Sequence, residues 1–211
     1  MKAIPFALVL SLAAAGCSSI ERSRNLANPA VPAQTLAQQV CSNCHGVDGN
    51  SISPNFPKLA QQTEPYLVEQ LRSFRSHNRS DPPGFEYMWG ISRSLSDAQI
   101  DGLAKYFSSQ RSTPNPHANA ALAREGKEIY DKGVPSKNIP PCGSCHGPQG
   151  QGNDKFPRLA GQHADYVMKQ LLVFQRTNER PEGAVMKDIA HSLTPEHIRD
   201  VAAYVEAIAS R

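Results

Sequence analysis

The stretch "CSNCHGVDGN", residues 41–50, places two cysteines and a histidine close together. A second stretch, "CGSCHGPQGQG", residues 142–152, repeats the order of two cysteines followed directly by a histidine. Closely spaced cysteines are typical of zinc binding, of disulfide exchange and of covalent haem attachment. The right chemistry must therefore account for both copies and for the histidine in each.

The two cysteine clusters belong to an internal duplication of the chain, with an offset of about a hundred residues. The segment "NFPKLAQQTEPYLVEQLRSF" aligns with "KFPRLAGQHADYVMKQLLVF", and "MWGISRSLSDAQIDGLAKYF" aligns with "MKDIAHSLTPEHIRDVAAYV". Between the halves, residues 111–118 carry prolines and polar side chains and are predicted to be a linker. We therefore expect two tandem domains, at 33–110 and 119–211.

Both halves are predicted to be all-α. Apolar residues recur at helical spacing after the motifs "FPKLA" and "FPRLA", and no segment shows the alternation of a strand. The last helix of each half has a start signal, with Ser96 in a capping box and Thr194 before a proline at the first helical position. A further helix is expected before each cysteine cluster, at about 33–40 and about 119–131.

Covalent haem explains the clusters better than zinc or disulfide exchange does. Paired zinc-binding cysteines usually lie about 15–20 residues apart, whereas these pairs lie in different halves. Disulfide exchange by Cys-x-x-Cys is typical of a βαβ fold, and no β pattern is visible. Neither chemistry requires the histidine, whereas Cys-x-x-Cys-His is the attachment signature of c-type haem. We expect two covalently bound haem c groups, with these candidate residues: Cys41, Cys44, His45, Cys142, Cys145 and His146.

Each haem iron needs a sixth ligand or an open face, and the duplication favours methionine. Met88 and Met186 occupy matched positions, each expected in an irregular stretch before the last helix. No histidine outside the two motifs is repeated, and His77, His163 and His197 are expected to be solvent-exposed. Because a thioether is a known axial partner of histidine, we predict both methionines to be iron ligands. The alternative is that they only fill the core.

Pro57 and Pro157 also occupy matched positions, shortly after the two histidines. Their carbonyl groups are candidates to accept a hydrogen bond from Nδ1–H of the histidine, which would fix its tautomer and raise its basicity. A simple turn before a helix explains the prolines equally well.

The N-terminus predicts export. Residues 1–16, "MKAIPFALVLSLAAAG", have the features of a secretory signal peptide, with an apolar run too short to span a bilayer. "AAGCSS" resembles the lipobox of bacterial lipoproteins, so Cys17 is either a lipidated membrane tether or a residue beside an ordinary cleavage site. Residues 17–32 are polar and are predicted to be a flexible tether. The net charge of +3 does not indicate a nucleic-acid-binding surface.

Taken together, "HGVDGNSISPNFPKLA", "YLVEQL" and "FPRLAGQHADYVMKQL" resemble dihaem cytochrome c4, which is built of two class I cytochrome c domains. The resemblance covers roughly residues 36–209. It implies that Cys41 and Cys44 hold the first haem, and Cys142 and Cys145 the second. The implied axial pairs are His45 with Met88 and His146 with Met186. One departure is that the helix before Cys41 lacks the glycine that often lets the first and last helices cross closely, whereas Gly126 offers one in the second half.

The resemblance also implies a function. It indicates a periplasmic electron carrier, not an enzyme, that works between a quinol-oxidising complex and a terminal oxidase or reductase. A lipid at Cys17 would hold such a carrier at the membrane. The alternative is a dihaem peroxidase, or a haem subunit of a periplasmic dehydrogenase or oxidase complex, and a peroxidase would need an axial position that can open.

Overall fold

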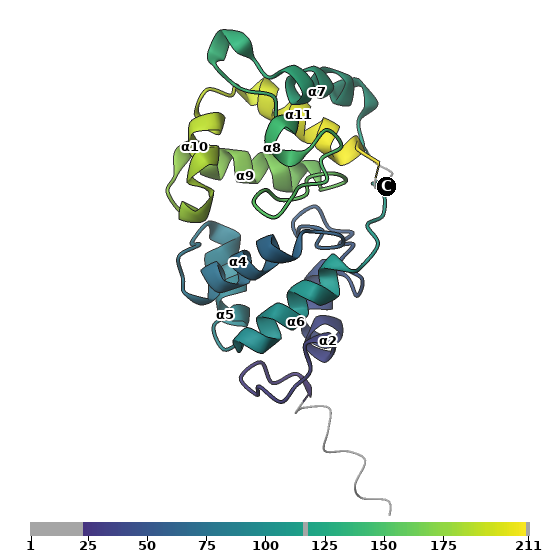
Figure 1. Ribbon diagram of the computed structural model, residues 1–211, viewed down its shortest axis with the longest axis vertical. Helices are drawn as coiled ribbons and strands as arrows, with labels where there is room; N and C mark the ends of the chain where they lie inside the picture. Colours follow the sequence, from purple (N-terminus) through teal and green to yellow (C-terminus); the bar gives the residue numbers. More distant parts are fainter. Residues whose placement is uncertain (1–22, 116–117, 210–211) are drawn as a thin grey trace, which may run out of the picture.

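The computed structural model describes residues 23–115 and 118–209, which form two helical bodies stacked along the long axis of the molecule (Figure 1). Each body has its own hydrophobic core. Within the described residues there is no strand, and Val134 and Ile139 form an isolated bridge. The all-α prediction is confirmed. The predicted signal peptide and Cys17 lie outside the described residues.

The first domain begins with a continuous helical run and ends with a long helix across it. Its elements are α2 (Ala33–Leu36), the π-helix η1 (Ala37–Cys41), α3 (Ser42–His45), α4 (Glu64–Arg75), the π-helix η2 (Gly84–Met88), α5 (Trp89–Ser92) and α6 (Asp97–Ser108). At the start of α6, Ser96 Oγ accepts a hydrogen bond from the Gln99 amide at 3.2 Å, so the predicted capping box is present.

The second domain repeats this order. Its elements are α7 (Ala120–Lys132), the 3₁₀ helix η3 (Pro135–Lys137), α8 (Gly143–His146), α9 (Ala164–Arg176), the 3₁₀ helix η4 (Pro181–Gly183), α10 (Ala184–His191) and α11 (Pro195–Ala207). Thr194 caps α11 by accepting a hydrogen bond from the His197 amide at 3.3 Å. The helices expected before the two cysteine clusters are present as the run of α2 and η1 and as α7.

The first and last helices of each domain cross closely, but the glycine that permits the crossing lies on different helices. On α7, a Cβ at Gly126 would lie 1.9 Å from the backbone oxygen of Asp200 on α11. In the first domain the glycine is on the last helix, because a Cβ at Gly102 would lie 2.6 Å from Cβ of Ala33 on α2. The absence of a glycine before Cys41 therefore does not prevent the close crossing.

Two segments differ from the sequence-based expectation. The end of the predicted tether packs on the first domain, since Val31 is buried in its core and Gln99 Nε2 donates to the backbone oxygens of Asn28 and Val31. The stretches before both methionines are helical, so the prediction of irregular loops is wrong. Proline is favoured in a first helical turn, where its missing N–H has no partner to lose.

The interface between the domains is polar and buried, with a pseudo-twofold pattern. Arg79 Nη1 donates to Gln70 Oε1 at 2.5 Å, and Arg180 Nη1 donates to Gln170 Oε1 at 2.5 Å. Each arginine also reaches the glutamine of the other domain, at 3.3 Å from Arg79 and 3.0 Å from Arg180. Asp81, fully buried, pairs with Arg79 at 2.7 Å. Hydrogen bonds from both arginines therefore connect the two domains across their interface.

The segment between the domains bonds the first domain through residues 111–113, and Asn115 Nδ2 donates to Glu206 Oε1 of the second domain at 2.5 Å. Lys58 Nζ donates to the Thr113 carbonyl at 2.8 Å, and the Asn50 amide group bonds both Arg111 and Thr113. In the described part of the chain, no helix is long and apolar enough to cross a bilayer.

Candidate haem-binding sites

Both Cys-x-x-Cys-His motifs lie on a helical turn. Cys41 ends η1, and the next helix, α3, holds Cys44 and His45. Cys142 precedes α8, which holds Cys145 and His146. Residues three apart on a helix share a face, so the two thiols of each pair are placed for the same edge of one porphyrin.

Each turn ends directly after the histidine, at a glycine. Gly46 has a φ of 78° and Gly147 a φ of 82°, a conformation that side chains with a Cβ rarely adopt. The chain therefore turns away from the helix at the same point in both halves, and the loop that follows returns beside the histidine.

The two histidines are oriented by the same hydrogen bond. His45 Nδ1 lies 2.9 Å from the Pro57 carbonyl oxygen, and His146 Nδ1 lies 2.9 Å from that of Pro157. A carbonyl oxygen only accepts, so Nδ1 carries the proton in both rings and Nε2 keeps its lone pair for a metal. Pro57 and Pro157 thus supply the carbonyl group that orients each histidine and do more than form a turn before a helix.

Burial sets the protonation of the histidines and of one thiol per motif. It lowers the pKa of His45 and His146, and the hydrogen bond to the proline carbonyl opposes this only in part. Burial also raises the pKa of Cys41 and of Cys142 to about 11. A neutral imidazole keeps the Nε2 lone pair that an iron ligand needs. Among the described residues, no cluster of three His, Cys, Asp or Glu side chains could hold a metal ion.

The surroundings of the motifs are aromatic and apolar. The Phe56 ring meets His45 edge-on, with centroids 6.2 Å apart, and the Phe156 ring meets His146 in the same way at 5.9 Å. Cys41 and Cys142 each pack against the hydrophobic core of their domain. A haem is a large apolar ring, so side chains of this kind form a suitable cradle for it.

Each predicted methionine ligand lies in a short helix before the last helix of its domain. Met88 is the last residue of η2, and its neighbour Tyr87 meets the Phe56 ring at 6.4 Å, the same ring that contacts His45. Met186 lies in the first turn of α10 and packs against the same core as Cys142. Both methionines are half-buried.

Sequence reasoning missed residues at the domain interface. His163 was expected to be exposed, but its side chain is buried and its Nε2 lies 2.8 Å from the Ser51 carbonyl of the other domain. Gln62 and Gln162 also bridge the domains, and the signal that could have found them is their matched position in the duplication. His163 offers no such signal, because Thr63 stands at its place in the first half.

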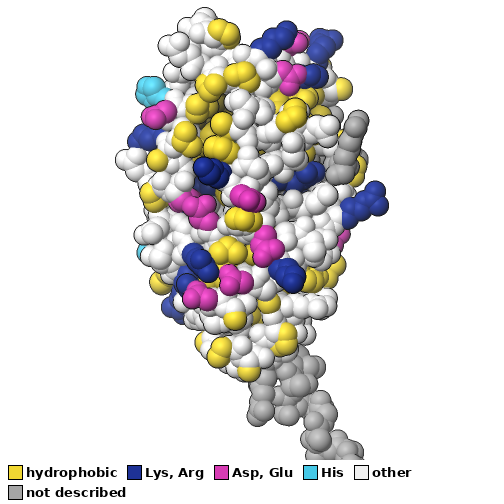
Figure 2. All heavy atoms as spheres, viewed as in Figure 1, with side chains coloured by type: hydrophobic (Ala, Val, Ile, Leu, Met, Phe, Trp, Pro, Cys, Tyr) yellow, Lys and Arg dark blue, Asp and Glu magenta, His cyan; other side chains and the backbone are white. Residues whose placement is uncertain are grey.

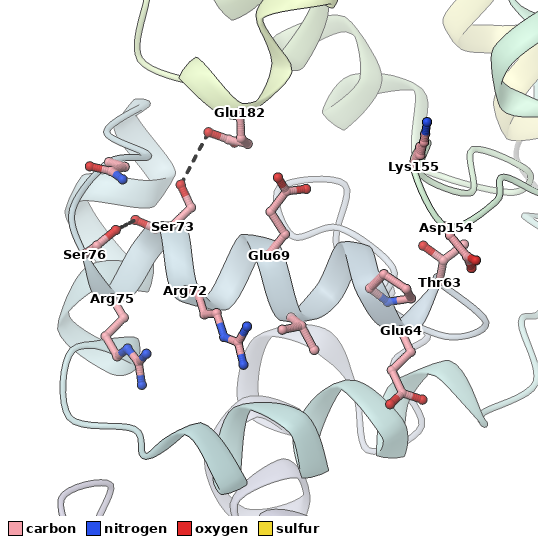
Figure 3. Close-up of a pocket in the computed structure, with 13 residues that line it drawn as sticks. Thr63, Glu64, Glu69, Arg72, Ser73, Arg75, Ser76, Asp154, Lys155 and Glu182 are labelled. Atoms are coloured by element: carbon pink, nitrogen blue, oxygen red, sulfur yellow. Dashed lines mark hydrogen bonds between the residues drawn. The ribbon is translucent and has the colours of Figure 1, made fainter.

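A groove of about 1650 Å³ runs beside α4, between it and the second domain (Figure 3). Carboxylates such as Glu69 and Asp154 and cations such as Arg72 and Lys155 line it, and Ser73 Oγ donates to Glu182 at 3.4 Å across it. None of the candidate haem residues lines this groove. On the face shown in Figure 2, basic and acidic side chains are interspersed and form no patch of one sign.

An attachment turn with an oriented histidine, present once in each of two all-α domains, defines a c-type cytochrome. Comparison with known proteins agrees, because the Cytochrome c family model matches the chain twice, over residues 30–111 and 123–209.

The matched proteins specify the class further. The chain is 39% identical over 178 residues to cytochrome c4 of Stutzerimonas stutzeri, across 80% of this chain and 84% of that protein. It matches the crystal structure of reduced recombinant cytochrome c4 from Pseudomonas stutzeri with a TM-score of 0.74 and 38% identity, across 83% of this chain and 96% of that one. It is 34% identical over 177 residues to the thiosulfate dehydrogenase electron acceptor of Stutzerimonas stutzeri (strain A1501), across 80% of this chain and 78% of that protein.

The chain therefore belongs to the dihaem cytochrome c4 family. It binds two haem c groups covalently and is a c-type electron carrier.

Proposed function

We propose that each haem of this electron carrier is attached through the two cysteines of one motif and held by one histidine and one methionine. The first set is Cys41, Cys44, His45 and Met88, and the second is Cys142, Cys145, His146 and Met186. The observation that carries this assignment is the repeated hydrogen bond from Nδ1 to a proline carbonyl, 2.9 Å long in both halves, which leaves Nε2 of each histidine for iron.

The haem groups supply one-electron chemistry at iron. The chain's own residues set the reduction potential of each iron. Methionine ligation and an apolar, buried environment favour the less charged ferrous state and raise the potential, whereas the hydrogen bond from Nδ1 makes the histidine more electron-donating and opposes this. With both axial positions filled by protein side chains, iron would exchange electrons without binding a substrate.

The working context that we propose is the periplasm, where the chain would carry electrons from a quinol-oxidising complex to a terminal oxidase or reductase and would not itself act as an enzyme. The export signal predicted at 1–16 supports this location. A lipid on Cys17 would hold the carrier at the membrane, and the mass of the mature N-terminal peptide would test for it. The two separate cores support a division of the chain into domains near 33–110 and 119–211, with the first domain extended upstream because Val31 belongs to its core.

The assignment is tested by a redox titration of the matured protein followed by optical spectra. Two haems per chain, a thioether-to-iron band in the oxidised protein and no rapid binding of carbon monoxide to the reduced protein are expected. Rapid stoichiometric binding of carbon monoxide would instead favour the alternative of a dihaem peroxidase, whose iron must have an open or opening axial site.

The match to a thiosulfate dehydrogenase electron acceptor favours a second candidate function, in which this chain accepts electrons from such a dehydrogenase. Mixing the oxidised protein with a thiosulfate dehydrogenase and thiosulfate tests it. Reduction of the haems that depends on thiosulfate and saturates with the carrier would support it, whereas reduction only by a quinol-oxidising complex would support the first candidate.

A further inference from the structure

One glutamine from each domain pairs with the backbone of the other domain. Gln62 Oε1 accepts a hydrogen bond from the Arg158 amide at 2.7 Å, and its Nε2 donates to the Arg158 carbonyl at 2.9 Å. Gln162 does the same to Lys58, with both bonds at 2.9 Å. Both glutamines are buried, so these bonds are made away from water.

The N–H groups that the glutamines bind belong to the peptide units that orient the histidines. The Arg158 N–H and the Pro157 C=O are parts of one amide, and that C=O accepts the hydrogen bond from His146 Nδ1. A continuous chain therefore runs from Gln62 in the first domain, through one amide, to the histidine of the second domain.

The reverse chain is also present. Gln162 Oε1 binds the Lys58 N–H, whose amide includes the Pro57 C=O, and this oxygen accepts the hydrogen bond from His45 Nδ1. The two chains cross the interface in opposite directions, so each glutamine lies in one domain and its histidine lies in the other.

Hydrogen bonds in such a chain polarise one another. An amide whose N–H is engaged carries more negative charge on its oxygen and becomes a stronger acceptor. A stronger acceptor at Nδ1–H makes the imidazole more electron-donating, and partners of a ligating histidine tune the metal in this way. The ferric state is then stabilised, and the reduction potential falls.

We propose that Gln62 and Gln162 are positioning residues that lower the reduction potential of the haem in the opposite domain. The inference rests on the proposed function, because it takes His45 and His146 as iron ligands. It makes the docking of the two domains part of the setting of each potential, so that neither haem has its final potential until the domains are in contact.

The test compares Gln62→Met and Gln162→Met in the full, matured chain. Methionine is about the size of glutamine, but its sulfur is a weaker acceptor than the glutamine oxygen for the hydrogen bond from the backbone N–H. The potential of each haem is measured by redox titration with NMR signals of the haem methyl groups assigned to their domain. For Gln62→Met we expect the equilibrium constant for reduction of the second-domain haem to rise roughly three- to tenfold, tenfold being about 59 mV for a one-electron couple. Gln162→Met should raise that of the first-domain haem.

Gln70→Met is the matched control. Gln70 is also a buried interface glutamine, but it bonds the guanidinium groups of Arg79 and Arg180 and touches neither of the two amides. Gln70→Met should not change the potential of the opposite domain's haem alone. The NMR signal of the His146 Nδ1 proton provides a second measurement, and it should move in Gln62→Met but not in Gln70→Met.

Three results would overturn the proposal. The first is a changed potential for the haem of the mutated domain and not for that of the opposite domain. The second is a fall of both potentials, as expected from domains that separate and admit water, and the third is no change in either potential with the His146 signal in place. Failure of the proposed function would look different, since the wild-type protein itself would then lack the spectrum of two histidine–methionine haems.

Discussion

At Gly126 the first and last helices of the second domain come too close for any side chain. A Cβ there would lie 1.9 Å from the Asp200 backbone oxygen, which cannot move aside as a flexible side chain would. Gly126→Ala should therefore lower the free energy of unfolding of the second domain by about 1–3 kcal/mol or more, through forced separation of α7 and α11. Thermal or denaturant unfolding of the matured protein measures this.

Gly90 provides the control, because the same glycine-to-alanine change can be made there in open space. It lies in α5 and a Cβ there would meet nothing within 4 Å. Gly90→Ala should leave the protein as stable as before or stabilise it by about 0.5–1 kcal/mol, because alanine loses less backbone entropy in a helix. Equal unfolding curves for the two variants would contradict the account of the helix crossing.

Single residues also show where sequence reasoning ends. The haem candidates could be predicted because covalent attachment imposes a fixed local pattern, and Pro57 and Pro157 because the duplication repeats them. The burial of His163 could not be predicted, since it depends on Ser51 of the other domain, and the packing of two domains leaves no local pattern in the sequence.

Among the elements, the last helix of each domain begins where its capping signal predicts. Ser96→Ala removes the hydroxyl that accepts from the Gln99 amide and should cost about 1 kcal/mol of stability. Ser108→Ala, at the exposed C-terminal end of the same helix, removes only a bond to the Lys105 carbonyl and should change stability by less than about 0.5 kcal/mol. Denaturant unfolding compares them, and a larger loss at Ser108 would contradict the role of the cap.

The elements before the methionines were harder to predict. Prolines and a glycine in "SDPPGFEYM" suggested an irregular loop, yet Pro82 and Pro83 start a helical segment that continues as η2. Proline is excluded from helix interiors but not from the first turn, so the same residues are compatible with both structures. In the folded chain Gly84 lies against the Phe74 ring, a contact that the local sequence does not reveal.

For the whole molecule, the buried pair of Arg79 and Asp81 lies at the domain interface, where both side chains also bond Gln170 of the second domain. Arg79→Leu would leave a fully buried carboxylate without its cation and should cost about 3–5 kcal/mol. Arg72→Leu is the control, since Arg72 pairs with Asp101 in an exposed bridge that should contribute about 0–1 kcal/mol. Two separate unfolding transitions in Arg79→Leu, but not in Arg72→Leu, would indicate domains that no longer unfold together.

The same pair predicts a response to acid. Burial alone would raise the pKa of Asp81, but the hydrogen bond and charge of Arg79 outweigh it and hold the pKa below its usual 3.8. The stabilisation is therefore present above about pH 4 and is lost as the pH falls through the lower, folded-state value. Stability measured against pH should show this loss in the wild type and not in an Asp81→Asn variant, and an identical acid limb in both would contradict the assignment.

The central claim is that each duplicated motif holds a haem whose iron has a methionine as its second axial ligand. The absorption spectrum of the oxidised protein tests this claim most directly. Met88→Ala and Met186→Ala should each remove about half of the thioether-to-iron band, and the double variant should remove all of it while both haems stay attached. A band that persists in the double variant, or a wild-type chain with fewer than two haems, would contradict the account.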